Sequence, residues 1–244
     1  MKIMSKQIWA FVVLLPFCGL ANSGENASNP LAAVSNTDVR IKYFDLDQGD
    51  RNEYYIDGAT MLTPKTKLKY ELHYWDTDAT GRDENDWESA SLKLIHFAKE
   101  GKLSGDRPYR LAIGLEWIKD LGDIEKGIGR DADLFAPLVG LAMVVRPGTT
   151  LIPLVQHFES YSGEDVSETA FRLTALQTLP DKVWAKADLK APYDWENDKV
   201  PASVEFQLGK SFTPSFGAYI DLQAGIGGDR SYDWATGVGL RFNY

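Results

Sequence analysis

The final residues of the chain alternate between two kinds of side chain. One set is Trp234, Thr236, Val238, Leu240, Phe242 and Tyr244, and the interleaved set, Asp233, Ala235, Gly237, Gly239, Arg241 and Asn243, contains no large apolar residue. A period of two is that of a β-strand, whose successive side chains point to opposite faces. A strand with one apolar face that ends on an aromatic residue is typical of the last strand of a transmembrane barrel. The pattern predicts an all-β fold, a transmembrane antiparallel up-and-down β-barrel.

The opposite end has the pattern of a secretory signal. Lys2 and Lys6 precede an apolar run over residues 8–20, which is too short to span a bilayer and is followed by small residues. We expect residues 1–21 to be removed, residues 22–37 to form a short N-terminal periplasmic segment, and residues 38–244 to form a barrel in the outer membrane of a Gram-negative bacterium. Cys18, the single cysteine, would leave with the signal.

The composition is acidic. The whole chain has a formal net charge of −9, and without residues 1–21 it has 24 Lys and Arg against 35 Asp and Glu, a net charge of −11. Such a chain repels phosphate, so we expect no nucleic-acid partner. No apolar run of about 18 residues or more follows the signal, so no transmembrane helix is expected.

Alternation predicts about twelve strands in all. The regular ones cover residues 67–74, 109–117, 183–189, 204–208, 216–224 and 234–244, and the less regular ones cover 38–46, 53–61, 87–98, 136–145, 150–158 and 166–177. Residues 138–145 are nearly all apolar, which leaves a buried helix as an alternative there.

The links between these strands alternate in length. Short links at residues 63–65, 100–107, 146–148, 179–181 and 212–214 separate longer, acidic links at 45–52, 76–86, 119–133, 159–168, 191–200 and 227–233. Short periplasmic turns and long outer loops are the outer-membrane pattern, and an even number of strands places both termini on the periplasmic side. The link 119–133 is the best candidate for a plug by its length.

Aromatic residues lie near both sets of links, where two interfacial girdles are expected. Trp75, Trp87, Trp117, Trp195 and Trp234 are near the long links, and Tyr109, Phe212, Phe216, Phe242 and Tyr244 are near the short ones. A secreted β-sandwich with surface aromatics is the alternative, and it explains the alternation but not the link lengths.

Candidate chemical groups are few. His157 lies beside Glu159, Ser160 and Ser162, which is a conceivable set of base, orienting group and nucleophile for a lipid hydrolase. No second motif supports catalysis, and an interfacial histidine is the simpler interpretation. The acidic link that contains Asp76 does not have the spacing of a calcium loop. We therefore expect no catalytic residue, no metal and no cofactor.

The face of each strand opposite the apolar one is expected to line the barrel interior. The candidate pore-lining residues are Lys67, Lys69, Glu71, His73, Arg110, Glu116, Arg172, Lys186, Asp188, Glu205, Asp221 and Arg241. A twelve-stranded barrel lies between small filled barrels and wide porins, so a narrow passage is expected. Both signs of charge are present, which argues against strong selection for one ionic sign. A closed, salt-bridged core without conduction is the alternative.

The order of several segments resembles the outer-membrane barrel family labelled "MetA-pathway of phenol degradation". These are Asn29-Pro30-Leu31-Ala32, Leu134-Phe135-Ala136-Pro137-Leu138-Val139-Gly140, Leu151-Ile152-Pro153-Leu154-Val155-Gln156 and Val204-Glu205-Phe206-Gln207-Leu208-Gly209-Lys210. The resemblance covers most of the mature chain and implies passage of small solutes, hydrophobic or aromatic ones included. The last strand also resembles the signal read by the barrel-assembly machinery, with Gly239, Phe242 and Tyr244 at its glycine and hydrophobic positions.

These observations lead to one main hypothesis and two alternatives. The main hypothesis is a single-domain outer-membrane barrel that acts as a passive channel or transporter for a small-molecule solute, with outer-membrane lipid, lipopolysaccharide and the assembly machinery as its other partners. A non-conducting structural or surface barrel is the first alternative. A lipid-modifying outer-membrane enzyme that uses His157 with Ser160 or Ser162 is the second.

Overall fold

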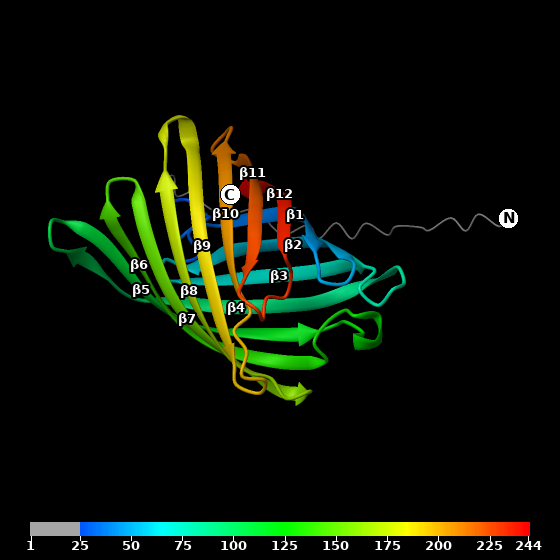
Figure 1. Ribbon diagram of the computed structural model, residues 1–244. Helices are drawn as coiled ribbons and strands as arrows, with labels where there is room; N and C mark the ends of the chain where they lie inside the picture. The colour runs from blue at the N-terminus through cyan, green and yellow to red at the C-terminus, as the bar shows by residue number, and fades with distance from the viewer. Residues whose placement is uncertain (1–24) are drawn as a thin grey trace.

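The computed structural model describes residues 25–244 and shows a closed barrel of twelve antiparallel strands (Figure 1). Each strand pairs with its neighbours in sequence, and the first pairs with the last to close the sheet. The strands are β1 (Asn36–Asp45), β2 (Asp50–Thr63), β3 (Thr66–Thr77), β4 (Glu84–Leu103), β5 (Arg107–Asp120), β6 (Ala132–Arg146), β7 (Thr149–Gly163), β8 (Ser167–Thr178), β9 (Val183–Asp194), β10 (Ala202–Ser211), β11 (Phe216–Ile226) and β12 (Trp234–Asn243). The predicted fold class is confirmed.

Helical structure is limited to two single turns, η1 (Ile124–Lys126) and η2 (Pro180–Lys182), among the described residues. The helix considered for residues 138–145 is wrong, because β6 pairs along its length with β5 and β7. Within residues 25–244 no helix is long and apolar enough to cross a membrane.

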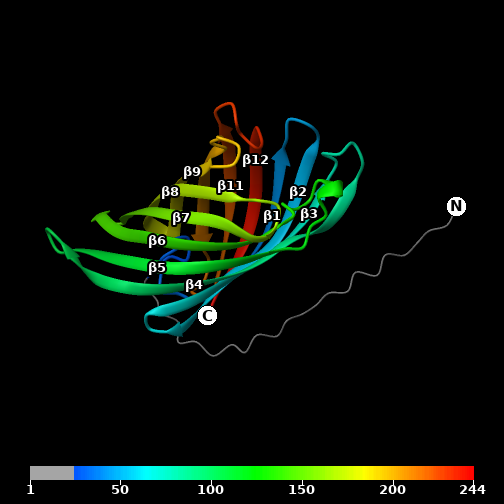
Figure 2. The same ribbon diagram turned by 90° about the horizontal axis from the view of Figure 1, so that it is seen from below.

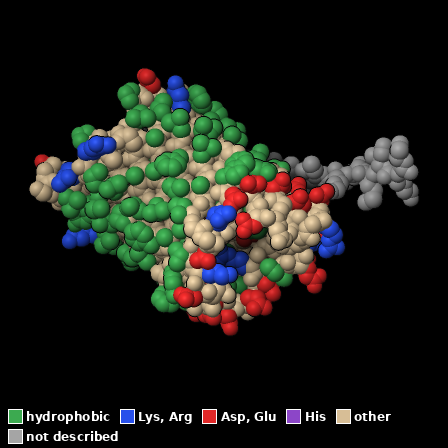
Figure 3. All heavy atoms as spheres, in the orientation of Figure 1, with side chains coloured by type: hydrophobic (Ala, Val, Ile, Leu, Met, Phe, Trp, Pro, Cys, Tyr) green, Lys and Arg blue, Asp and Glu red, His purple; other side chains and the backbone are tan. Residues whose placement is uncertain are grey.

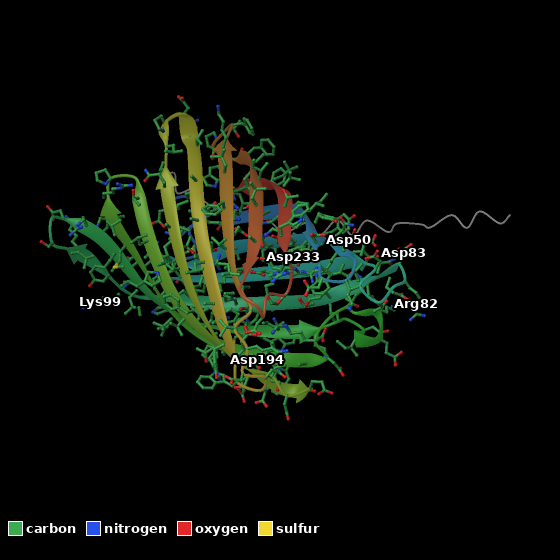
Figure 4. All side chains as sticks on the ribbon, viewed as in Figure 1. Asp50, Arg82, Asp83, Lys99, Asp194 and Asp233 are labelled. Atoms are coloured by element: carbon green, nitrogen blue, oxygen red, sulfur yellow. The ribbon has the colours of Figure 1, made fainter. Side chains whose placement is uncertain are left out.

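Turns and loops occupy opposite ends of the barrel (Figures 1 and 2). The end that we call the turn end carries the links 64–65, 104–106, 147–148, 179–182 and 212–215, and the loop end carries 46–49, 78–83, 121–131, 164–166, 195–201 and 227–233. Several strands are longer than the sequence pattern indicated, so two of the expected long links shrink to residues 46–49 and 164–166. In Figure 4, Asp50, Arg82 and Asp83 lie at the loop end, and Lys99 lies at the other end.

The outer face of the barrel is apolar. Large hydrophobic side chains such as Ile113, Leu222 and Val238 are 50%, 58% and 55% exposed. Hydrophobic side chains cover much of the wall in Figure 3, while acidic ones gather around the loop end. A wall of this kind is stable in lipid, where a closed barrel also leaves no unpaired strand edge. The β-sandwich alternative is excluded because the sheet closes on itself.

Aromatic clusters lie near both ends of the outer face. Tyr74 contacts Trp87 with ring centroids 5.3 Å apart near the loop end, and Phe216 contacts Phe242 at 5.5 Å near the turn end. Trp75 was expected in the outer girdle, and the structure corrects this. Its neighbour Tyr74 takes the outward position, so the Trp75 ring points inward, where its Nε1 donates to Glu53 at 3.2 Å.

A candidate solute passage inside the barrel

The inner wall encloses a cavity of about 590 Å³. Nine of the twelve residues expected to face the interior line this cavity: Lys67, Lys69, Glu71, His73, Glu116, Arg172, Lys186, Glu205 and Arg241. The other three also lie on the inner side of the wall. Asp188 and Asp221 are buried behind their hydrogen-bond partners, and Arg110 lies beneath the N-terminal segment. Whether these residues line a conducting pore stays a prediction.

The cavity has more cations than carboxylates. Eleven Lys and Arg side chains line it, and they are Arg40, Lys42, Arg51, Lys67, Lys69, Lys93, Arg130, Arg172, Lys186, Lys190 and Arg241. Six carboxylates line it, and they are Glu53, Asp57, Glu71, Glu116, Glu168 and Glu205. Three more carboxylates, Asp38, Asp188 and Asp221, are fully buried in the wall, and counting them still leaves two more cations than acids. The interior of this acidic chain is therefore cationic.

Most of the buried charges are held in pairs. Arg241 donates from Nη2 to Asp38 at 2.7 Å, and Tyr219 donates its hydroxyl to the same carboxylate at 2.7 Å. Glu205 accepts from Lys42 at 3.1 Å and lies 2.5 Å from the Lys186 ammonium. Such pairing is what makes ionised groups tolerable away from bulk water. It also fixes the positions of the long side chains around the cavity.

A second group surrounds His73 on β3. Its Nδ1 lies 2.7 Å from Glu53 and its Nε2 lies 3.5 Å from Glu71, and its ring stacks on Tyr55 with centroids 4.8 Å apart. Both ring nitrogens are therefore engaged by carboxylates. This arrangement holds His73 in the polar wall, with both ring nitrogens facing carboxylates.

Residues 25–35 form a segment inside the barrel near the turn end, which we call the N-terminal segment. Arg110 donates to Glu25 at 2.7 Å, Arg241 donates to Ser28 at 2.8 Å, and Lys67 donates to the Ala32 carbonyl at 2.8 Å. Leu31 is fully buried in an apolar cluster with Ile95, Phe97, Ala112, Ala142 and Ile152. From the sequence, residues 22–37 are expected to form a periplasmic segment. Residues 25–35 of that range lie within the barrel, and Asn36 and Thr37 already belong to β1. Residues 22–24 lie outside the described range, as does the expected signal 1–21.

The link between β5 and β6 is not the plug that its length suggested. It folds on itself at the loop end, where Asp123 caps η1 and Gly127 ends it in a left-handed conformation. Lys126 donates to Asp86 at 2.6 Å, and Arg130 is the residue of the link that reaches the cavity. The N-terminal segment occupies the interior instead.

Several charged residues that line the cavity are not among those predicted from the sequence, including Arg40, Lys42 and Glu53. A usable signal was present, because Arg40 and Lys42 alternate with Val39 and Ile41, which are 43% and 47% exposed on the outer face. The alternation is broken at Phe44, which faces inward at the end of the strand, where the guanidinium carbon of Arg51 lies 4.4 Å from its ring centroid.

In the enzyme alternative, Glu159 lies beside His157, but neither Ser160 nor Ser162 is hydrogen-bonded to this histidine. His157 Nδ1 lies 3.0 Å from the Thr169 hydroxyl, and its Nε2 lies 3.3 Å from Glu159. The Ser160 hydroxyl accepts a hydrogen bond from the backbone N–H of Val166 at 3.0 Å instead of contacting His157. Within the described part of the chain, no cluster of His, Cys, Asp and Glu side chains has the geometry to hold a metal ion.

Solved structures share this fold at low sequence identity. The NanC porin matches with a TM-score of 0.66 and 11% identity over 85% of this chain and 100% of that chain. An outer membrane channel from Pseudomonas putida F1 matches with a TM-score of 0.65 and 8% identity over 88% and 97%. Outer membrane phospholipase A from Escherichia coli matches with a TM-score of 0.53 and 13% identity over 86% and 92%.

At these identities the likeness shows the barrel fold, which is common to porins, channels and an enzyme. No family model and no curated protein matches the sequence. The specific family that the sequence resembles is therefore not confirmed.

Proposed function

We propose that the chain is an outer-membrane barrel of a Gram-negative bacterium that allows passive passage of small organic anions. The observation that carries this proposal is the set of eleven cations against six carboxylates around the cavity. A confined site lined by one sign of charge raises the local concentration of the opposite ion. The mixed signs in the sequence argued against charge selection, but several acids lie recessed in the wall while the longer cationic side chains reach the cavity.

The cavity also has apolar surface, which favours solutes with an apolar or aromatic body. Leu154, Phe158 and Pro192 line it beside the charged residues. A solute with one carboxylate and a small ring would contact both kinds of wall. Insertion would depend on the barrel-assembly machinery, with Gly239, Phe242 and Tyr244 of the C-terminal end as its signal, and the acidic loops would face lipopolysaccharide.

The alternative of a closed structural barrel is supported by a specific observation. The N-terminal segment fills part of the interior through Leu31, and ion pairs such as Arg241–Asp38 bridge neighbouring strands. A barrel that stays closed at all times would pass no solute. A flux measurement decides between the two.

The test uses two impermeant aromatic probes of similar size and opposite charge, benzenesulfonate and phenyltrimethylammonium. The chain without residues 1–21 is refolded into liposomes, and efflux of each preloaded probe is followed. We expect benzenesulfonate to leave faster by about tenfold, the lower end of what a charged cleft adds to local counter-ion concentration. Equal rates would contradict anion preference. Retention of both probes would favour the structural barrel.

A further inference from the structure

Two cations face each other across neighbouring strands in the cavity. Arg172 of β8 and Lys190 of β9 are Cα partners in the strand register, and both side chains line the cavity. Like charges directly opposite each other in a sheet are destabilising. The pair therefore calls for a compensating anion close by.

The carboxylates near this pair already have hydrogen-bond or ion-pair partners. Asp188, which is fully buried, accepts from the Nε–H of Arg172, which lies 2.8 and 2.9 Å from its two oxygens, and from Nη2 of the same guanidinium. It also accepts from the Thr174 hydroxyl at 3.1 Å. Glu205 is bound by Lys42 and Lys186, and it also accepts from Gln223 at 2.7 Å. Three cations, Arg172, Lys186 and Lys42, thus pair with these two carboxylates, and Lys190 is a fourth cation that forms no ion pair with either of them.

Within residues 25–244, two donor groups of the pair have no hydrogen-bond partner. Lys190 makes no hydrogen bond and no ion pair with any of residues 25–244, and Arg172 Nη1 makes no hydrogen bond within the same range. Asp188 holds the rest of the Arg172 guanidinium in place, so its free edge is pre-oriented. A carboxylate has two oxygens that match two such donors.

We propose that Arg172 and Lys190 form a binding site for a small organic carboxylate, with Nη1 and Nζ as donors. Apolar side chains lie beside the two cations. Leu154 is the Cα partner of Arg172 on β7, and Pro192 follows Lys190 by two residues on the same face of β9. The ligand is therefore a carboxylate with an apolar body. The site deepens the proposed function and rests on it, because such a solute reaches the site through the barrel interior.

The first test measures binding without requiring conduction. Equilibrium dialysis of labelled benzoate against the refolded barrel in detergent gives a Kd for the wild type and for Lys190→Gln. The matched control is Lys69→Gln, which removes one positive charge from the same cavity on β3. We expect Lys190→Gln to raise Kd by about tenfold or more, the effect of losing one charge-assisted hydrogen bond. We expect Lys69→Gln to change Kd by less than about twofold, as for charges without direct contact.

A second measurement needs no variant. Acetic anhydride modifies free lysines, and mass spectrometry gives the rate at each position in the wild type. We expect benzoate to slow acetylation of Lys190 and to leave that of Lys69 unchanged, and we expect acetate to protect Lys190 less because it lacks the apolar body. Absence of saturable binding, equal weakening by the two variants, or equal protection of the two lysines would overturn the site.

The outcomes separate the two proposals. Benzoate binding that depends on Lys190 in a barrel that retains benzenesulfonate would support the site and contradict passage. Benzenesulfonate efflux together with binding that ignores Lys190 would support passage and contradict the site.

Discussion

At the scale of single residues, the wall depends on buried charge pairs that join strands far apart in sequence. The Asp38 side chain is fully buried and that of Arg241 is 4% exposed, and the two lie on β1 and β12, where the barrel closes. We predict that Asp38→Asn destabilises the barrel by about 3–5 kcal/mol, because it leaves the Arg241 guanidinium buried without its partner. Urea unfolding in detergent micelles measures the change in the free energy of unfolding. Asp106→Asn, at a carboxylate that is 87% exposed, serves as the control, and a loss below about 1 kcal/mol for Asp38→Asn would contradict the prediction.

Gly239 has a packing role in addition to its predicted place in the assembly signal. A Cβ at this position would overlap the ring of Tyr219, whose hydroxyl is fixed by Asp38. We predict that Gly239→Ala destabilises the barrel by about 1–3 kcal/mol, as overpacking does. In a Tyr219→Ala background, Gly239→Ala should lower the free energy of unfolding by much less. A double-mutant cycle of urea unfolding measures this difference. Gly228→Ala, where no atom lies within 4 Å, is the matched control. Equal losses in both backgrounds would rule out this role.

The residue pattern predicted which side chains face inward but not how they pair. Period-2 alternation was enough to place Glu205 and Arg241 on the inner face. Their partners lie 163 and 203 positions away, at Lys42 and Asp38, because closure brings the first strand beside the last. Residues so far apart in the chain form no local sequence pattern from which their pairing could be predicted.

At the scale of elements, the N-terminal segment lies inside the turn end of the barrel. Leu31 anchors it in an apolar cluster. We predict that Leu31→Asp releases the segment, because an unpaired carboxylate is costly there, and that single-channel conductance rises. Ala27→Asp adds the same charge at a residue that lines the cavity outside the cluster, and it should leave the conductance near that of the wild type. Unchanged conductance in Leu31→Asp would show that the segment does not limit flow.

The same segment carries a pH-dependent anchor. Burial alone raises the pKa of the Glu25 carboxyl, but hydrogen bonds from Arg110 and from the Ala33 backbone N–H outweigh it and hold the pKa below its ordinary value of 4.5. A lowered pKa means that the carboxylate stabilises the docked segment above that value and loses this effect as the pH falls below it. We predict a conductance that is constant near neutral pH and rises below pH 4.5. Glu25→Gln should remove this rise, and its persistence in the variant would assign it to another carboxylate.

The strands themselves were largely predictable, because each must repeat every two residues to present one face to lipid. The ends of the strands were not predictable, because β4 and β7 extend beyond the apolar belt with polar residues on both faces. The docking of residues 25–35 could not be predicted either. It depends on a tertiary pocket formed by Ile95, Phe97 and Ile152 from two different strands.

At the scale of the whole molecule, the acidic composition and the cationic interior are both properties of the same barrel. The chain carries a net charge of −9, and acidic side chains gather at the loop end in Figure 3. The cavity has an excess of five cations. The overall charge therefore does not indicate the sign of the charge inside the barrel, because it does not distinguish the loops from the inner wall.

The most direct test of this account is the reversal potential of the barrel in a planar bilayer across a KCl gradient. Potassium and chloride ions have nearly equal mobility, so the sign of the potential reports the charge preference of the passage. The cationic cavity predicts a value displaced toward the equilibrium potential of chloride, and charge-reversing Lys190→Glu should reduce that displacement. A value at zero, or one displaced toward the equilibrium potential of potassium, would contradict the account.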